Sequence, residues 1–545
     1  MKEDIQDLLV AAIKKSLEDL KIDKVFNEEI YLDLPADARF GDLSTNIALR
    51  LKKTLNKSPR EIADTVIEAI KPHLEEPQLK GCIKDIKAQG QGFINFYLDE
   101  KYFHEVLKEI IMPGTESMRP NIGLGKRVLV EYVSANPTGP LSVAHARQAA
   151  VGDTLANILS FLGFDTKREY YLNDEGNQIN ILGESVALRI RELNGEKIEF
   201  PENYYQGEYI YTIAQQIKDK KLEPEDISKY AVDYILSIIK KELDDFGVKF
   251  DYWYSQKGLR ESGKIEEALN LLKEKGFLYE KEGALWFKST IFKDDKDRVV
   301  VKSDKSFTYL APDIAYHEEK YRRGFKWLIN LWGPDHHGYI SRLKAAVQAF
   351  NHESDSLSIV IVQLASIFRE GKSVEMSTRK GQYITLREVL DEVGKDASRF
   401  FFLMRRTSSH LDFDLGLAKK QTPENPIFYI QYAYARISSI LRQGSKPVRK
   451  QADLSVLNEK EEIELIKKLW QFFYILKICS SIQDPYMLTV YLQQLAEAFH
   501  KFYDLHRVLG EDDALTHARL ELIEAVKIVI STGLDLLGIS KPEKM

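Results

Sequence analysis

The chain has 545 residues, of which 44% are hydrophobic and 29% charged, and its formal net charge is −6. This length exceeds what one hydrophobic core supports, so several domains are expected, and no stretch approaches the roughly 20 apolar residues that cross a bilayer. The two cysteines, Cys82 and Cys479, exclude a disulfide framework and a cysteine-based zinc site, and they favour a reducing cytoplasm.

Three blocks follow one another along the chain. Residues 1–112 combine amphipathic helices with an alternating strand at 92–98, which predicts a small α+β domain. Residues 119–424 alternate strands and helices, with a mostly helical, charged insertion at about 185–275. From 425 to 545 helical periodicity dominates. The predicted fold class is therefore α/β and multidomain: a central Rossmann-like parallel-sheet domain, an N-terminal α+β domain and a C-terminal all-helical domain.

The second block opens with a strand, a rigid loop and a helix. The run Val128–Val133 is apolar except for Glu131, and the loop Asn-Pro-Thr-Gly-Pro at 136–140 continues neither a strand nor a helix. Helical spacing of apolar residues follows over 143–162, and a second strand is predicted over Thr166–Leu172. Such a unit has a right-handed crossover, and its strand ends open onto a ligand crevice.

This corner is suited to binding an anion. A helix N-terminus presents unpaired N–H groups, and His145 in its first turn can donate to a phosphate, which would favour the charged imidazole. The residues alone leave open a second interpretation, in which His145 is an ordinary packed or solvated histidine and Ser142 an ordinary N-cap. Two common nucleotide motifs are excluded: no G-x-G-x-x-G follows the strand, and Gly-Lys-Ser at 371–373 lacks the earlier glycine, because position 366 is Ser.

The loop and helix start resemble a known signature. The string from Val133 to His145 resembles the HIGH motif of class I aminoacyl-tRNA synthetases, in the form used by arginyl-tRNA synthetases. The HIGH-like motif comprises Ala135, Asn136, Pro137, Thr138, Gly139, Pro140, Leu141, Ser142, Val143, Ala144 and His145. The resemblance extends over nearly the whole chain, through the segments 171–174, 205–210, 250–255, 309–317, 332–338, 376–381, 400–405, 410–414 and 425–436.

The resemblance implies a function for each block. It implies an arginine–tRNA ligase that uses ATP to convert L-arginine into arginyl-adenylate and transfers arginine to the 3′ end of tRNA(Arg). Residues 1–112 would contact the tRNA elbow, 119–424 would form the class I catalytic domain, and 425–545 would bind the anticodon. ATP is expected with Mg²⁺ bridging its phosphates, without protein-bound zinc. A cytoplasmic monomer without a membrane partner is expected, and the family generally requires bound tRNA for activation.

Glu131 is the main clue to the substrate. A carboxylate buried in an apolar strand needs a cation nearby, unless it lies on an edge strand and faces water. A substrate guanidinium would meet this need, because its planar fork of donors matches a carboxylate. The resemblance assigns the arginine side chain to Glu131, Tyr309 and Asp313, and the amino-acid backbone end to Asn136.

The resemblance also assigns nucleotide contacts and catalytic groups. The segment 376–381 resembles the KMSKS loop, although a solvated basic turn would explain its residues alone. Asp335-His336-His337 alone suggests a metal-dependent phosphoesterase, but His is scarce (11 in all), and its place after a Trp327–Leu331 strand favours nucleotide contact. The ATP-contact set is Pro137, Thr138, Gly139, His145, Gly333, Asp335, His336, Met376 and Ser377, and the catalytic set is His145, Ser142, Arg379 and Lys380.

Two departures from the family pattern bear on activity. Ser142 stands where the HIGH pattern has its first histidine, and Glu375 and Thr378 replace the KMSKS lysines. Ser142 suggests an alternative function, a catalytically weakened paralogue that binds tRNA. Another class I synthetase, for example one for cysteine, is disfavoured by the arginine-pocket residues and by the missing zinc-type cysteines.

The start of the third block is rich in aromatic residues. Phe428 and Tyr432 share a helix face, so core packing explains part of the cluster, and the rest can stack on anticodon bases. The net charge of −6 gives no sign of an RNA partner, because RNA affinity depends on local basic patches.

Overall fold

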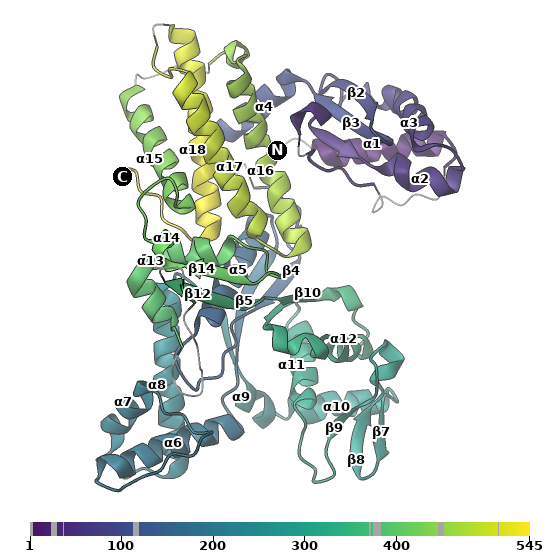
Figure 1. Ribbon diagram of the computed structural model, residues 1–545. Helices are drawn as coiled ribbons and strands as arrows, with labels where there is room; N and C mark the ends of the chain where they lie inside the picture. The colour runs from purple at the N-terminus through teal and green to yellow at the C-terminus, as the bar shows by residue number, and fades with distance from the viewer. Residues whose placement is uncertain are drawn as a thin grey trace. The chain divides into compact units, whose positions relative to one another are not determined.

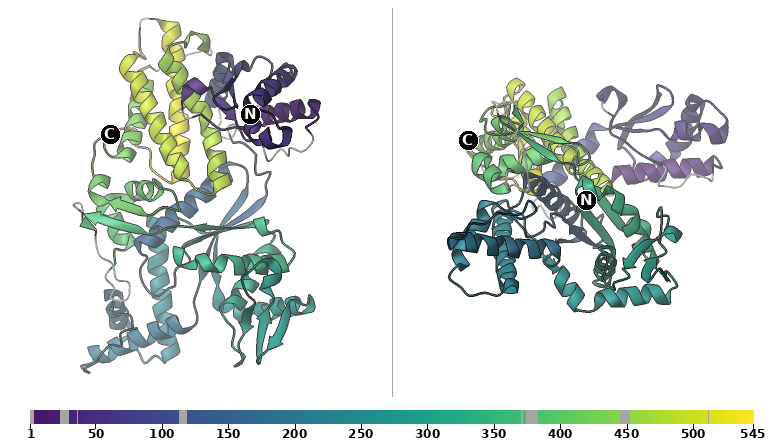
Figure 2. Two further views of the ribbon diagram at one scale, coloured as in Figure 1. Left: turned by 45° about the vertical axis from the view of Figure 1, so that its right-hand side comes forward. Right: turned by 60° about the horizontal axis from the view of Figure 1, so that its bottom comes forward.

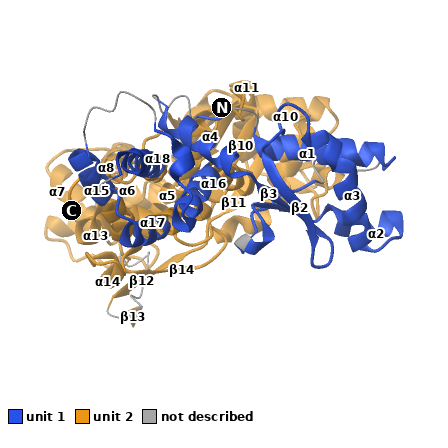
Figure 3. Cartoon of the chain, turned by 90° about the horizontal axis from the view of Figure 1, so that it is seen from above, with its two compact units in different colours: residues 1–120, 436–472, 497–529 blue, residues 121–435, 473–496, 530–545 orange. Residues whose placement is uncertain are grey.

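The computed structural model describes residues 4–22, 30–35, 37–112, 119–369, 372–373, 383–444, 452–510 and 512–545. The chain forms two compact units, each built from three stretches of sequence (Figure 3). Unit 1 comprises residues 1–120, 436–472 and 497–529, and unit 2 comprises 121–435, 473–496 and 530–545. Within the described part of the chain, every helix is too short or too polar to span a membrane.

The N-terminal part of unit 1 is a small α+β fold (Figure 1). Its antiparallel sheet has the order β1-β3-β2, and the strand predicted at 92–98 is its central strand β3. Helix α3 starts after Ser58, whose side chain accepts the Glu61 N–H while Glu61 caps Ser58 in return. The elements are α1 (Ile5–Asp19), β1 (Leu43–Thr45), α2 (Ile47–Leu55), α3 (Pro59–Leu74), β2 (Ile83–Gln89), β3 (Phe93–Leu98) and α4 (Glu100–Ile111).

The core of unit 2 is a five-stranded, fully parallel sheet of order β11-β10-β4-β5-β6. The strands are β4 (Arg127–Glu131), β5 (Asp165–Leu172), β6 (Tyr252–Ser255), β10 (Trp327–Trp332) and β11 (Leu357–Ile361). The chain passes from β4 to β5 and β6 on one side, and later adds β10 and β11 on the other side. The order therefore reverses between β4 and β10, and ligands bind at the carboxyl ends of strands at such a point. The predicted parallel sheet is confirmed.

Helices cover both faces of this sheet (Figure 1, Figure 2). Helix α5 (Val143–Phe161) connects β4 to β5, α11 (Leu310–Arg322) precedes β10, and α12 (Ile340–Ala349) connects β10 to β11. At Gly152 of α5, an added Cβ would lie 2.3 Å from the Tyr132 ring, so only glycine allows this close contact. Tyr132 thus faces α5, and its neighbour Glu131 faces α11, because successive side chains of an extended chain alternate.

The predicted helical insertion is mostly helical, but it contains the edge strand β6. The segment has only four residues, three of them aromatic, so its sequence shows no alternation that would predict a strand between helices. Its pairing with β5 makes it a strand. A separate antiparallel sheet, β7-β8-β9, follows and was not predicted. The elements of this region are α6 (Asn177–Leu193), α7 (Glu208–Ile217), α8 (Pro224–Asp245), α9 (Gln256–Glu261), α10 (Lys264–Glu274), β7 (Leu278–Lys281), β8 (Ala284–Phe287) and β9 (Arg298–Val301).

The chain then forms a third small sheet and ends in long helices. Strands β12 (Ala365–Arg369), β13 (Lys372–Ser373) and β14 (Leu411–Asp414) make the sheet, with α13 (Leu386–Leu403) and α14 (Leu415–Ala418) beside it in sequence. The described residues after Asp414 contain helices but no strand, which confirms the helical C-terminal block. These helices are α15 (Pro426–Gly444), α16 (Lys460–Ile482), α17 (Tyr486–Leu505) and α18 (Asp513–Leu537). In α15 the rings of Phe428 and Tyr432 stack at 6.3 Å, and RNA stacking there stays a prediction.

Candidate active site

The loop after β4 begins with two residues in a strained conformation. Val133 and Ser134 have φ values of +67° and +40°, in the left-handed region that a β-branched residue rarely adopts. The Ser134 N–H donates to the Tyr132 carbonyl at 2.9 Å and closes a tight turn. Strain of this kind persists only where surrounding structure imposes it, and it clusters at functional sites. It turns the HIGH-like motif (residues 135–145) away from the direction of β4.

Three tyrosine hydroxyls from different elements hold the backbone of this motif. They donate as follows: Tyr170 to the Ala135 carbonyl (2.8 Å), Tyr209 of α7 to Thr138 (2.7 Å), and Tyr383 to Pro140 (2.9 Å). An added Cβ at Gly139 would lie 3.0 Å from the Tyr209 hydroxyl and 3.2 Å from the Tyr383 hydroxyl, so a larger residue would displace both. Helix α7 of the insertion therefore positions the motif.

His145 is a neutral hydrogen-bond donor. The backbone N–H of Ser142, the N-cap of α5, donates to His145 Nδ1 at 3.2 Å. Since Nδ1 is an acceptor, the ring proton lies on Nε2. Burial lowers the pKa of His145 to about 4, although the residue as a whole is partly exposed. His145 therefore offers an N–H and no positive charge in this structure, and the charged imidazole stays a prediction for the site with a phosphate bound.

The turn after β10 lies next to the start of α5. At Gly333 an added Cβ would meet Asp335 Oδ1 at 2.6 Å and Gln148 Nε2 at 3.9 Å, which places this turn beside α5, close to His145. Asp335, His336 and His337 are exposed on the turn, and His336 Nε2 lies 3.4 Å from Asp335 Oδ2. No group of three potential metal ligands occurs in the described ranges of the chain.

The KMSKS-like segment is only bracketed by the structure. Glu375, Met376, Ser377, Thr378, Arg379 and Lys380 lie outside the described residues. The segment that follows is tied to the HIGH-like motif by backbone hydrogen bonds. The Leu386 N–H donates to the Leu141 carbonyl at 2.8 Å, and the Val143 N–H donates to the Ile384 carbonyl at 3.3 Å. The chain therefore resumes beside the helix N-terminus.

Glu131 is buried and already has a cationic partner. Lys320 of α11, which is fully buried, donates from Nζ to Glu131 Oε2 at 2.5 Å and to Asn330 Oδ1 at 3.2 Å. Ser134 Oγ donates to Glu131 Oε1 at 3.1 Å. The charge that neutralises Glu131 thus comes from the chain itself, whereas the sequence analysis assigned this role to a substrate guanidinium. The expectation of a buried carboxylate with a nearby cation is confirmed, but the identity of that cation was missed.

A helical spacing in the sequence could have revealed Lys320. Asp313, His317 and Lys320 lie four and seven residues apart, so α11 presents them on one face. His317 Nδ1 lies 2.8 Å from the Asp313 carbonyl, and Asn330 Nδ2 lies 2.8 Å from His317 Nε2. The amide donates to Nε2, so Nδ1 carries the proton and donates to the carbonyl. Burial and the Lys320 charge hold the pKa of His317 well below its usual value, so this link is neutral.

Asp313 is the carboxyl group on this face of α11. Among the described residues it forms no ion pair with a cation. The Tyr339 hydroxyl donates to Asp313 Oδ2 at 2.7 Å. Burial raises the pKa of Asp313 to about 7; the Tyr339 hydrogen bond lowers it, Glu131 raises it and Lys320 lowers it. The influence of Glu131 places both carboxyl groups in one electrostatic environment. Asp313 is thus poised between its neutral and ionised forms near pH 7.

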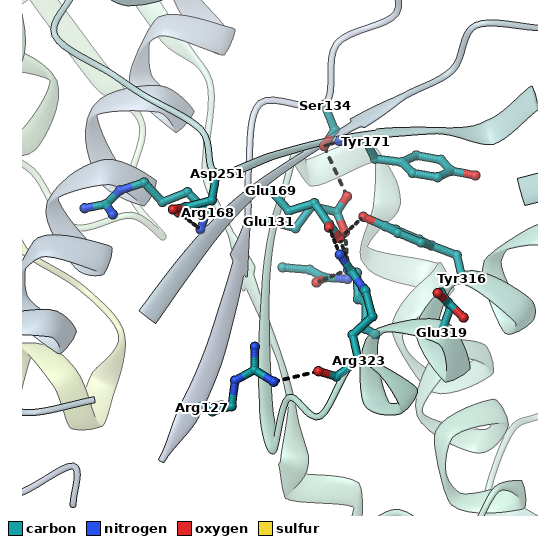
Figure 4. A network of polar contacts seen from close by, with 12 residues as sticks. Arg127, Glu131, Ser134, Arg168, Glu169, Tyr171, Asp251, Tyr316, Glu319 and Arg323 are labelled. Atoms are coloured by element: carbon teal, nitrogen blue, oxygen red, sulfur yellow. Dashed lines mark hydrogen bonds and ion pairs between the residues drawn. The ribbon is translucent and has the colours of Figure 1, made fainter. Parts of the chain in front are cut away.

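A second ion pair fixes α11 to the sheet (Figure 4). Glu169, opposite Glu131 on β5, is fully buried and accepts two hydrogen bonds from Arg323, at 2.6 and 2.9 Å. The Tyr316 hydroxyl donates to Glu169 Oε1 at 2.6 Å. Removing one partner of such a pair is strongly destabilising, so it holds α11 in place.

Two further predicted residues lie in different settings. Asn136 accepts from Asn173 Nδ2 at 2.7 Å and donates to Gln178 Oε1 at 2.6 Å, so its amide is oriented in the loop. Tyr309 directly precedes α11 and is 85% exposed. The structure thus puts Glu131 of β4 and Asp313 of α11 in one electrostatic environment, leaves Asn136 and His145 in the HIGH-like motif, and leaves Tyr309 outside the buried group.

Three family models match consecutive parts of the chain. They are described as the arginyl tRNA synthetase N terminal domain, over residues 5–98, the class I (R) tRNA synthetase catalytic domain, over 107–407, and the DALR anticodon binding domain, over 430–545. Their order follows the three blocks of the sequence.

Full-length relatives and solved structures agree with these matches. Arginine–tRNA ligases of Citrifermentans bemidjiense and Geobacillus kaustophilus are each 45% identical, across 100% of this chain and 100% and 98% of theirs. A putative arginyl-tRNA synthetase of Campylobacter jejuni is 36% identical with a TM-score of 0.75, across 81% of this chain and 100% of that one. The Thermus thermophilus arginyl-tRNA synthetase, 21% identical, shares the fold with a TM-score of 0.80 over 99% of this chain and 100% of its own. The chain belongs to the arginyl-tRNA synthetase family of class I aminoacyl-tRNA synthetases.

Proposed function

We propose that the chain is an arginine–tRNA ligase, which activates L-arginine with ATP and transfers it to the 3′ end of tRNA(Arg). The observation that supports this most directly is Asp313, a buried carboxyl group poised for ionisation at the ligand-binding edge of the sheet. Family membership and the HIGH-like motif support a nucleotide site next to it.

The charges beneath α11 match one guanidinium. Glu131 is paired with Lys320, and Glu169 is paired with Arg323, so each pair is neutral. Asp313 adds one unmatched negative charge when it ionises. A guanidinium would supply one positive charge and a planar set of donors. Lysine would supply the charge but only a compact ammonium, which leaves buried acceptors unsatisfied. Asn136 is proposed to contact the amino-acid backbone end, and the exposed Tyr309 to close onto the side chain.

Activation joins two anions, so it depends on position and on positive charge. The arginine carboxylate attacks the α-phosphorus of ATP, a bond to phosphorus forms, and pyrophosphate leaves with the electron pair of the broken bond. The N-terminus of α5 and His145 Nε2–H provide neutral donors. We assign the positive charge to Arg379, Lys380 and Mg²⁺ that enters with ATP. The proposed nucleotide contacts are Pro137, Thr138, Gly139, Gly333, Asp335, His336, Met376 and Ser377.

Transfer follows from the adenylate. A ribose hydroxyl at the 3′ end of the tRNA attacks the activated carbonyl carbon, the new ester bond forms, and AMP leaves. We propose the division into residues 1–112, 119–424 and 425–545, with the first part on the tRNA elbow and the last on the anticodon. A cytoplasmic monomer is proposed as well.

Ser142 is compatible with activity. His145 Nδ1 is contacted by the Ser142 hydroxyl at 3.1 Å and by the backbone N–H of residue 142 at 3.2 Å, and the backbone contact does not depend on the side chain at this position. Replacing a histidine there removes a donor but preserves the tautomer of His145. This argues against a catalytically weakened paralogue.

Arginine-dependent ATP–pyrophosphate exchange, measured with and without tRNA(Arg), tests the proposal. We expect exchange with arginine and none with lysine or cysteine at equal concentration, and charging of tRNA(Arg) in a parallel assay. Exchange with a different amino acid would overturn the proposed substrate. Binding of tRNA(Arg) without any exchange would instead support the paralogue.

A further inference from the structure

We infer that Tyr171 is a substrate-contact residue of the arginine pocket, whose phenolic oxygen accepts an N–H of the guanidinium. This inference rests on the proposed function. It starts from a buried hydroxyl that has no hydrogen-bond partner among the described residues.

The Tyr171 ring is held in one position. Tyr171 is the second-last residue of β5, and it lies on the same face as Glu169, two residues earlier, beneath α11. Its ring stacks on Tyr316 with centroids 4.2 Å apart and on Tyr254 of β6 at 6.5 Å. Its backbone N–H donates to Ser134 Oγ at 3.1 Å. Figure 4 shows the side chain extending from β5, with its hydroxyl at the end remote from Ser134.

The hydroxyl stands out among its neighbours. Tyr171 is only 7% exposed, and a buried polar group normally has a partner. The nearby Tyr170, Tyr316 and Tyr339 hydroxyls donate to a carbonyl or a carboxylate. Tyr132 also has a buried hydroxyl for which the described part of the chain offers no partner, but it lies on the opposite face of the sheet, towards α5. A missing partner alone therefore does not identify a ligand contact.

The charges around Tyr171 identify the kind of ligand. Burial is the main cause of the raised pKa of Tyr171. The next causes are four carboxylates, those of Asp313, Glu131, Asp174 and Glu175. The phenol stays neutral at physiological pH, and Asp313 is the first of these carboxylates to act on it. A cation that reaches this point gains both an acceptor and favourable electrostatics.

Counting acceptors shows why a guanidinium needs Tyr171. Each oxygen of Glu131 already accepts a hydrogen bond, from Lys320 or from Ser134, and Asp313 Oδ2 accepts one from Tyr339. A guanidinium has five N–H donors in one plane. The free lone pairs of Asp313 satisfy only part of this set, and the Tyr171 oxygen would add a further acceptor for the same cation. The hydroxyl that lacks a partner in the free protein would gain one from the substrate.

The test is Tyr171→Phe, which keeps the stacked ring and removes the oxygen. We expect the KM for arginine to rise about tenfold, as for the loss of a hydrogen bond to a charged group, while the KM for ATP and the melting temperature stay unchanged. Tyr254→Phe, in the same aromatic stack, is the matched control, and it should leave the KM for arginine unchanged.

Agmatine, which has the guanidinium but no carboxylate, locates the contact. Its inhibition constant should rise in Tyr171→Phe by the same factor as the KM for arginine, and calorimetric binding of arginine to the free enzyme should weaken in parallel. An unchanged KM in Tyr171→Phe would overturn the inference, as expected if water serves the hydroxyl. A parallel rise of both KM values with a lower melting temperature would also overturn it. Failure of the proposed function can be told apart from failure of this inference, because the parent enzyme would then show no arginine-dependent exchange.

Discussion

The two ends of the candidate active site use charge in opposite ways. Beneath α11, Glu131 and Lys320 form a buried ion pair, and Asp313 adds a carboxyl group poised to ionise. At the start of α5, His145 is neutral, and the HIGH-like motif is held by tyrosine hydroxyls and backbone hydrogen bonds. In the proposed function, the first region would recognise a cation through the ionised form of Asp313. The second region would meet an anion with neutral donors.

This difference separates specificity from chemistry. The ion pairs Glu131–Lys320 and Glu169–Arg323 are already neutral, so we propose that the charge of Asp313 selects the amino acid. We propose that the positive charge that activation requires comes from Arg379, Lys380 and Mg²⁺ bound to ATP. A change beneath α11 should therefore alter stability or arginine affinity, whereas a change at the HIGH-like motif should alter the rate of activation.

Lys320→Met is expected to have the largest effect. It leaves the Glu131 carboxylate buried without its cation, and removing one partner of a buried pair costs about 3–5 kcal/mol. Chemical denaturation of the variant and the parent measures this change in the free energy of unfolding. The double variant Glu131→Gln/Lys320→Met removes both charges and should recover most of the loss. A single variant as stable as the parent would show that the pair does not support the fold.

Asp313→Asn should specifically weaken arginine binding. The substitution keeps the shape but removes the unmatched negative charge, and losing a charged hydrogen-bond partner of a buried cation costs about 2–4 kcal/mol, or roughly 30- to 1,000-fold in the KM for arginine. The KM for ATP should stay the same in pyrophosphate exchange. Glu318→Gln, on the same helix but paired with Arg322 and His352, is the control. Equal arginine affinity in Asp313→Asn and the parent would contradict the assignment.

The KM for arginine should also depend on pH. The guanidinium binds the ionised form of Asp313, and the raised pKa of about 7 means that protons compete with arginine below this value. Between pH 8 and pH 6 the KM should rise about tenfold as the pH falls, and it should level off above pH 8. Asp313→Asn should abolish this dependence. The pKa of His145, about 4, gives no inflection in this range, so a matching shift in the KM for ATP would contradict its neutral role.

The sequence was informative where local pattern determines structure. The strand, loop and helix around the HIGH-like motif followed from the apolar run, the Pro/Gly loop and the helical spacing, and they appear as β4, the loop and α5. The need of Glu131 for a cation followed from the cost of burying a charge. The first inference required no contact between distant segments. The second required only that some cation contacts Glu131, without saying which one.

What the sequence did not show depends on distant contacts. Lys320 lies 189 residues from Glu131, and only the packing of α11 on the sheet brings them together. The tautomer of His145 depends on a backbone N–H, and the role of Tyr209 depends on how α7 packs under a loop 71 residues earlier. Side-chain types alone carry none of this information.

Tyr209→Phe should have the smallest effect, and it tests the neutral end of the site. Tyr209 donates to the Thr138 carbonyl at 2.7 Å, and this is the one hydrogen bond of its side chain to the HIGH-like motif among the described residues. Losing one neutral hydrogen bond costs about 1 kcal/mol. The motif would keep its Tyr170 and Tyr383 contacts, so it should loosen without unfolding.

We therefore expect kcat for pyrophosphate exchange to fall about fivefold in Tyr209→Phe, with the KM for arginine unchanged. Tyr211→Phe is the matched control, because Tyr211 lies on the same helix but is exposed and contacts Gln215. If Tyr209→Phe raised the KM for arginine and left kcat intact, the HIGH-like motif would control arginine affinity, and the division between the two ends of the site would be wrong. A fall in kcat alone would show that the insertion helix acts on the nucleotide end, because it fixes the backbone that the phosphate must meet.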